Sequence, residues 1–227
     1  MTRSRTRGAL AAAAATMVLS GCGGHPGDAA VIGSESIRTA QVDEVALALC
    51  SAQSVGGEAP AQDVPARTAR QGALGVLVSS ALSLQYGQAT GVEVDAAQVS
   101  AAVAANRASI DQLPASRREA FEDTLRTFAE GQLTLIAAGR ARLLQRGTRN
   151  PTEQQSLTEG TRLRDAWART NDVDVTVDPR YGRFSAGALR PQSGSLSVPV
   201  SSPAAAGAEE QPASEWVTAL PASQKCR

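Results

Sequence analysis

The spacing of apolar side chains between residues 39 and 170 constrains this fold more than any other feature of the sequence. Leucine, valine and alanine recur there every three or four residues, which places them along one face of an α-helix. Capping boxes that start at Asp95, Ser116 and Thr152 predict where three of the helices begin. We expect five helices, over about 39–50, 66–86, 95–113, 116–146 and 152–170.

The spacing becomes alternating directly after the last of these helices. Residues 172–178 read Asp-Val-Asp-Val-Thr-Val-Asp, the pattern of a strand with valines on one face and polar side chains on the other. The apolar segment 31–37, near the start of the fold, is the expected partner. The sequence thus predicts a mainly α-helical domain of about five helices, closed by a small β pairing of the first and last strands.

Composition excludes several function classes. The 227 residues include only two Trp, two Tyr and three Phe, too few for an aromatic-lined cofactor pocket or a base-stacking platform. The 22 basic and 22 acidic residues balance to a formal charge of zero. Nucleic-acid binding requires an excess of Lys and Arg to neutralise phosphates, so we expect no nucleic-acid partner.

The start of the chain has the pattern of a secretory signal. Three arginines precede an apolar run over 9–19, and the sequence Leu-Ser-Gly-Cys follows at 19–22. This phrase resembles the lipobox of bacterial lipoprotein precursors, which implies cleavage after residue 21 and a lipid on Cys22. Such a lipid would anchor the protein at the outer face of the cell membrane. The alternative is an ordinary secretory signal with an incidental cysteine.

Four segments follow from this interpretation: a signal peptide over 1–21, a flexible Gly-rich tether over 22–28, the helical domain over 29–184, and a tail over 185–227. The tail is rich in Ser, Pro and Ala, so we expect it to be mostly disordered. Cleavage removes three basic and no acidic residues, which leaves a net charge of −3. A chain of this charge is not expected to bind anionic headgroups beyond its own lipid.

Two cysteines remain once Cys22 carries a lipid. In an extracytoplasmic protein Cys50 and Cys226 are candidates for a disulfide, and the alternative is two free thiols. The bond would close a loop of 176 residues, because it joins positions 50 and 226.

Two short phrases at the ends of the helical domain resemble a known family. Residues 30–39, Ala-Val-Ile-Gly-Ser-Glu-Ser-Ile-Arg-Thr, resemble the opening strand, turn and helix of SurA N-terminal-domain and PrsA-type chaperones. Residues 177–184, Val-Asp-Pro-Arg-Tyr-Gly-Arg-Phe, are similar to the closing strand of actinobacterial lipoprotein relatives. The resemblance covers 29–184 and implies a SurA-N-like fold that binds unfolded polypeptides.

We expect no enzymatic activity and no cofactor. Fuller members of that family carry a parvulin prolyl-isomerase domain before the final helix, whereas only residues 147–151 separate the last two helices here. The single histidine, His25, lies in the tether, which disfavours Ser-His-Asp, Cys-His and zinc sites. Asp172, Asp174 and Asp178 lack the Gly and Glu of a calcium loop, so they are expected on the solvated face of a strand.

The leading hypothesis is therefore a lipid-anchored, ATP-independent chaperone-like protein whose partners are unfolded or extended exported polypeptides. Its clients would contact an apolar groove between helices. The candidate contacts, which ordinary core packing would also explain, are Leu74, Leu77, Phe121, Leu125 and Phe128.

The alternative is a non-catalytic scaffold or adaptor that binds one cell-envelope partner. Trp216 would provide the contact, because it is the one aromatic residue of the tail beyond position 184.

Overall fold

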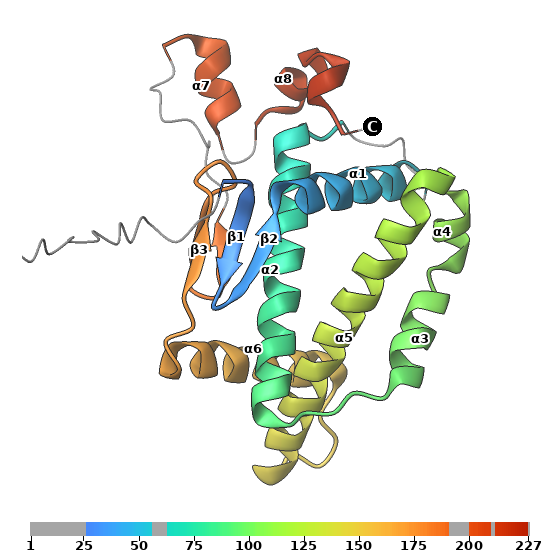
Figure 1. The fold of residues 1–227 in the computed structure, drawn as a ribbon, viewed down its shortest axis with the longest axis vertical. Helices are drawn as coiled ribbons and strands as arrows, with labels where there is room; N and C mark the ends of the chain where they lie inside the picture. The colour runs from blue at the N-terminus through green and yellow to red at the C-terminus, as the bar shows by residue number, and fades with distance from the viewer. Residues whose placement is uncertain (1–25, 56–62, 191–199, 210–211, 227) are drawn as a thin grey trace, which may run out of the picture.

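The computed structural model describes residues 26–55, 63–190, 200–209 and 212–226. Its long helices surround α2, with a small β-sheet on one side and a separate pair of short helices beside the start of α2 (Figure 1). The strands are β1 (Asp28–Ile32), β2 (Glu35–Arg38), β3 (Val175–Val177), β4 (Arg183–Ser185) and β5 (Ala188–Arg190). The helices are α1 (Thr39–Val55), α2 (Ala66–Thr90), α3 (Ala96–Ala104), α4 (Arg107–Gln112), α5 (Ala115–Gln145), α6 (Glu153–Thr170), α7 (Ser202–Ala208), α8 (Ser214–Ala219) and the 3₁₀ turn η1 (Ala222–Gln224).

The predicted helix starts are confirmed at two of three places. At α6 the Thr152 side chain accepts from the Gln155 amide, and the Gln155 side chain accepts from the Thr152 amide. At α3 the Asp95 carboxylate accepts from the Ala97 amide at 2.8 Å. The prediction for Ser116 is wrong, because α5 begins at Ala115. Pro114 is the N-cap residue and has no side chain that can cap, and Ser116 lies inside the first turn of the helix.

Three helices also differ in extent from the predictions, and the first of them, α1, runs to Val55 rather than to Cys50. The expected helix over 95–113 is divided into α3 and α4, and the Asn106 side chain at the break donates to the Ala102 carbonyl at 2.9 Å. Helix α2 runs to Thr90, where Gly91 ends it with a φ of 66°. That left-handed conformation is a common helix C-cap and costs a glycine little.

The predicted pairing of residues 172–178 with the start of the fold is confirmed by β3 and β1. Two details differ: the expected strand over 31–37 is a hairpin of β1 and β2 that turns at Gly33, whose φ is 58°, and β3 is not the last strand, because β4 and β5 follow it.

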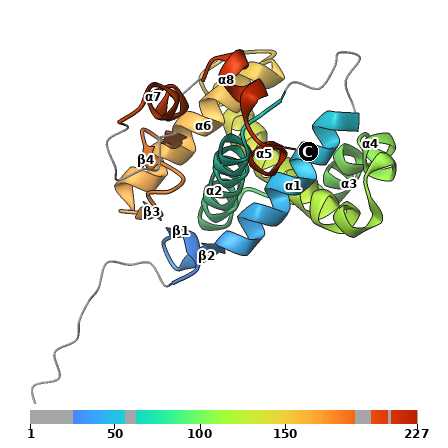
Figure 2. The same ribbon diagram turned by 90° about the horizontal axis from the view of Figure 1, so that it is seen from above.

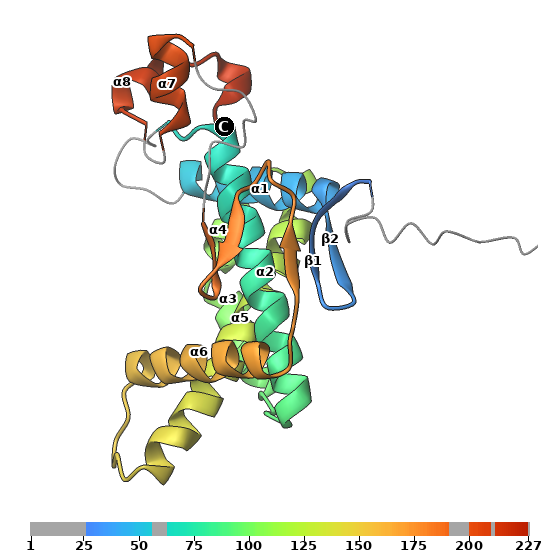
Figure 3. The same ribbon diagram turned by 90° about the vertical axis from the view of Figure 1, so that its left-hand side faces the viewer.

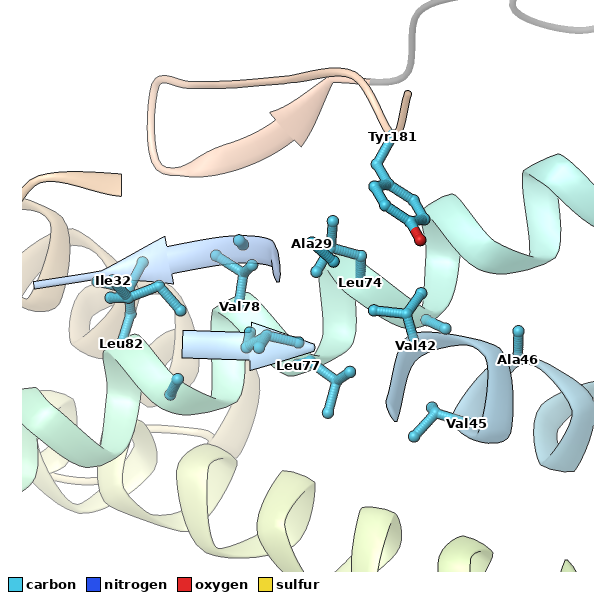
Figure 4. Packing of buried hydrophobic residues seen from close by; sticks show 14 residues of the cluster. Ala29, Ile32, Val42, Val45, Ala46, Leu74, Leu77, Val78, Leu82 and Tyr181 are labelled. Atoms are coloured by element: carbon cyan, nitrogen blue, oxygen red, sulfur yellow. The ribbon is translucent and has the colours of Figure 1, made fainter. Parts of the chain in front are cut away.

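Strand β1 lies between β2 and β3, and both neighbours are antiparallel to it, with Val31 opposite Thr176. The valines of the alternating segment pack against the core, together with Ile32 and Tyr181. Figure 4 shows this core between the sheet, α1 and α2. The mainly helical fold with a small closing sheet is therefore as expected.

The tail differs from the expectation of disorder. In its described part, β4 and β5 form a hairpin whose Phe184 and Leu189 pack on the core, and α7, α8 and η1 follow. Composition favours disorder when a segment cannot bury enough apolar surface. Here a covalent link compensates, since Cys226 is disulfide-bonded to Cys50, as predicted, and its amide donates to the Val64 carbonyl at 2.7 Å.

Further contacts hold this C-terminal unit beside the start of α2. The ammonium of Lys225, the only lysine of the chain, lies 2.7 Å from the Asp63 carboxylate and 2.7 Å from the Thr218 carbonyl. Arg67 donates to the Glu209 carbonyl at 3.0 Å. Figure 3 shows the unit at one end of the molecule, with α6 crossing near the other.

Reduction or loss of the disulfide should destabilise the protein and release the C-terminal unit. We expect Cys226→Ser to lower the free energy of unfolding by about 2–5 kcal/mol, since the bond closes a loop of 176 residues. Urea unfolding with and without reductant measures this. Reductant should leave Cys50→Ser/Cys226→Ser unchanged, and an equally stable single variant would show that the bond contributes nothing.

Helix α5 lies unusually close to α6 at a pair of glycines. A Cβ atom added to Gly139 would collide with the backbone of Ser156 and Gly160, and one added to Gly160 would collide with the Leu135 backbone. Backbone cannot rotate out of the way as a side chain can. These two positions therefore require glycine.

We expect Gly139→Ala to lower the free energy of unfolding by about 1–3 kcal/mol, because the added methyl group forces α5 and α6 apart. Gly72→Ala in α2 is the matched control. A Cβ there meets no atom within 4 Å, so the better helix propensity of alanine should raise stability by about 0.5–1 kcal/mol. Thermal and urea unfolding of both variants checks this, and equal shifts would contradict the close-packing account.

Candidate functional site

The five candidate client contacts do not form one continuous surface. Leu74 is completely buried against the sheet, and Phe121, 5% exposed, belongs to a separate cluster with α1 and α4. For these two residues the core interpretation is correct, because each faces a neighbouring element rather than a groove. Leu77 is 8% exposed, and Leu125 and Phe128 are half-buried.

One of the five, Leu77, reaches a hollow of about 440 Å³ between α1, α2 and α5. The residues that line this α1–α2–α5 hollow come from all three helices. Figure 1 shows α5 diverging from α2 below α1. Buried Val45 and Leu77 lie at its base, together with the small side chains Ala120 and Thr124. The rest of the lining is polar, so the hollow is small and mixed in character and is not the wide apolar groove that the chaperone hypothesis predicts.

Three carboxylates line the same hollow: Glu44 of α1, and Glu119 and Asp123 of α5. None of them has an ion pair within the described part of the chain. By contrast, Glu122 on the same helix pairs with Arg107 and Arg126. The acids at the start of α5 also favour its dipole, yet their free oxygens give the hollow a negative rim.

Two further hollows flank the β4–β5 hairpin, with volumes of about 340 and 520 Å³. Both are lined by Phe184 and Gly187. Beside them lies Arg164 of α6, whose side chain is only 4% exposed and which pairs with Asp165 at 2.8 Å. Sequence reasoning did not identify this pair, because an Arg-Asp dipeptide within a helix carries no sign of burial.

All donors of the Arg164 guanidinium have partners. Nη1 donates to the hydroxyls of Ser79 and Ser83 at 3.1 and 3.3 Å, while Nε and Nη2 donate to Asp165. Nη2 also donates to the Gly187 carbonyl at 3.4 Å. The arginine therefore links α2, α6 and the hairpin, and this complete satisfaction points to a structural role rather than to a binding site.

Other ionisable groups are perturbed by local contacts. The Arg162 guanidinium holds the pKa of Glu159 below its usual value through a hydrogen bond. Arg180 does the same to the pKa of Asp178. Burial raises the pKa of the Tyr86 phenol, whose ring meets the Trp167 ring edge-on at 5.8 Å. None of these groups lines the α1–α2–α5 hollow.

Some of the predictions concern residues outside the described ranges, and others concern metal sites. Cys22, His25 and the signal segment lie outside the described residues. Within the described ranges, no three His, Cys, Asp or Glu side chains are grouped as metal ligands would be. Over the same ranges, no helix has the length and apolarity to cross a bilayer.

Trp216 is engaged within the C-terminal unit. Its indole nitrogen donates to the Pro203 carbonyl at 2.9 Å, and its ring lies against Gly207, where a side chain would collide with it. Figure 2 shows α7 and α8 from above, at the end of the molecule where α2 begins. The one aromatic residue of the tail thus has a partner inside the chain.

No protein-family model, curated protein or solved structure matches this chain.

Removal of the buried arginine should be far more costly than removal of an exposed one. We expect Arg164→Met to lower the free energy of unfolding by about 3–5 kcal/mol, because it leaves the Asp165 carboxylate without its cation and removes the donor to the hydroxyls of Ser79 and Ser83. The control Arg126→Met breaks an exposed pair with Glu122 and should cost at most about 1 kcal/mol. Urea unfolding measures both, and similar losses would contradict the structural role of Arg164.

Proposed function

We propose that the protein is a lipid-anchored, ATP-independent chaperone-like protein that binds extended segments of exported polypeptides at the outer face of the cytoplasmic membrane. The lipobox-like phrase ending at Cys22 supports the location. The mainly helical fold, closed by its first and last strands, agrees in element order with the SurA-N resemblance. The proposed activity is binding without catalysis.

The observation that carries this proposal is the α1–α2–α5 hollow. Its mostly polar lining includes the apolar side chains Val45, Leu77 and Ala120. Three carboxylates, those of Glu44, Glu119 and Asp123, also line it and lack counter-ions among the described residues. An extended segment that combines small aliphatic side chains with a basic residue would bury the former and pair with the latter. Such segments are common in unfolded chains, so the contact is weak and tolerant of sequence.

The adaptor hypothesis has less support. It depends on an available Trp216, whereas this side chain is hydrogen-bonded to Pro203 and packed against Gly207. The hollow on the helical domain is the better candidate contact.

Reversal of charge at the rim should weaken client binding without disturbing the core. We expect Glu119→Lys/Asp123→Lys to raise the protein concentration that halves client aggregation by about tenfold, because basic client residues then meet like charges. The client is diluted from urea and its aggregation followed by light scattering. Reductant is omitted, since it would also open the bond between Cys50 and Cys226.

The matched control is Glu93→Lys/Glu130→Lys, which changes the net charge by the same amount at two exposed residues away from the hollow. It should suppress aggregation as the unmodified protein does. If the unmodified protein fails to suppress aggregation at stoichiometric amounts, the chaperone proposal is wrong. If both double variants lose activity equally, the hollow is not the binding site.

A further inference from the structure

Five exposed arginines lie at the end of the sheets where the tether joins the fold. We call them the tether-side arginines: Arg38, Arg70, Arg180, Arg183 and Arg190. They are scattered over more than 150 positions of sequence, so only the fold brings them to this end of the molecule. Figure 3 shows the ends of β2 and β5 and the start of β4 at this same end.

Several contacts connect this surface to the first described residues. The amide of Thr39, directly after Arg38, donates to the Gly27 carbonyl at 2.8 Å. Arg180 shares a hollow with Pro26 and Gly27. Arg70 and Arg180 are both close to Asp43, with which Arg70 pairs at 2.6 Å. The surface therefore begins where the tether ends.

Arg183 and Arg190 are the most unusual members of this group. They are direct cross-strand partners on β4 and β5, and both are exposed on the face opposite Phe184 and Leu189. Neither has an ion pair or hydrogen bond within the described part of the chain. Like charges directly opposite each other destabilise a hairpin, so this pair favours a bound anion.

The neighbouring acids do not neutralise the surface. Asp43 and Asp178 are paired with Arg70 and Arg180, and Asp28 is the third acid at this end of the sheet. Five arginines against these three acids leave a local excess of positive charge, although the mature chain as a whole is acidic.

We propose that the tether-side arginines contact the anionic phospholipid headgroups of the membrane in which the protein is anchored, with Arg183 and Arg190 binding phosphate between them. Cys22 is four residues from Pro26, so an extended chain spans at most about 14 Å between the lipid and this surface. Arginine binds phosphate in a bidentate manner, and basic side chains add attraction to anionic bilayers.

The orientation of the protein on the membrane affects the proposed function. The inference rests on the proposed anchoring at Cys22 and does not depend on client binding. Figure 1 shows the sheet on one side of α2 and α5 on the other. The α1–α2–α5 hollow lies close to the arginine surface, since its Glu44 directly follows Asp43, which pairs with Arg70. Contact through the arginines would therefore hold the hollow near the bilayer, where exported polypeptides emerge. A protein without the lipid on Cys22 would lose its anchor but would keep the positive charge of the tether-side arginines.

The test uses residues 22–227 with Cys22→Ser, so that no lipid contributes to binding. We expect this protein to partition onto vesicles containing about 30% phosphatidylglycerol at low salt and not onto pure phosphatidylcholine vesicles. Arg183→Gln/Arg190→Gln should reduce partitioning by about tenfold or more, since each basic residue contributes about fivefold. Cosedimentation measures the bound fraction, and thermal unfolding confirms that the variants fold.

The matched control Arg140→Gln/Arg149→Gln removes the same charge from exposed positions near the far end of α5, and partitioning should be nearly unchanged. Equal losses in the two variants, equal binding to both vesicle types, or no binding to anionic vesicles at low salt would each overturn the proposal. The aggregation assay is separate, so a loss of client binding with intact vesicle binding would reject only the chaperone function.

Discussion

The close approach of α5 to its neighbours through small side chains is the constraint on which the rest of the structure depends. Gly131 lies against Ser80 and Ser83 of α2, and farther along α5 the pair Gly139 and Gly160 brings α6 into backbone contact. Few large side chains are available to separate the helices, so they pack through alanine, glycine and serine. Beyond the contact at Gly131, α5 diverges from α2 toward its N-terminus (Figure 1). The α1–α2–α5 hollow occupies that divergence.

The arrangement around α2 also gathers charge of each sign. Carboxylates without counter-ions among the described residues line the hollow, whereas arginines gather at the end of the sheets. A balanced net charge hides both groups, since they cancel in the sum. In the proposed function the two surfaces have different partners, basic client segments and anionic headgroups. The surfaces are adjacent, because Glu44 of the hollow directly follows Asp43, which pairs with Arg70.

Most of the elements could be predicted from the sequence, because periodicity and capping are local. The long helices and the alternating strand follow from residues within a few positions of each other, whereas the pairing of that strand with the start of the fold was inferred from two separate apolar segments. The errors arise where a local signal competes with another. Pro114 starts α5 before Ser116 can cap it, and Asn106 accompanies a break that periodicity alone does not reveal. The composition of the C-terminal unit predicts disorder, because composition does not include the stabilising effect of the disulfide to Cys50.

The candidate site was less predictable, since helical spacing identifies a buried face but not the neighbour that covers it. Leu74 and Phe121 share an apolar pattern with Leu77, yet only Leu77 reaches a hollow. By itself the sequence determined the helices, the closing strands, the disulfide partners and the lipobox-like start, all of which are written in local order or in residue chemistry. Only the tertiary structure decided which carboxylates lack counter-ions, that Arg164 is buried, and that distant arginines meet beside the tether. Those properties depend on the distances between segments far apart in the chain.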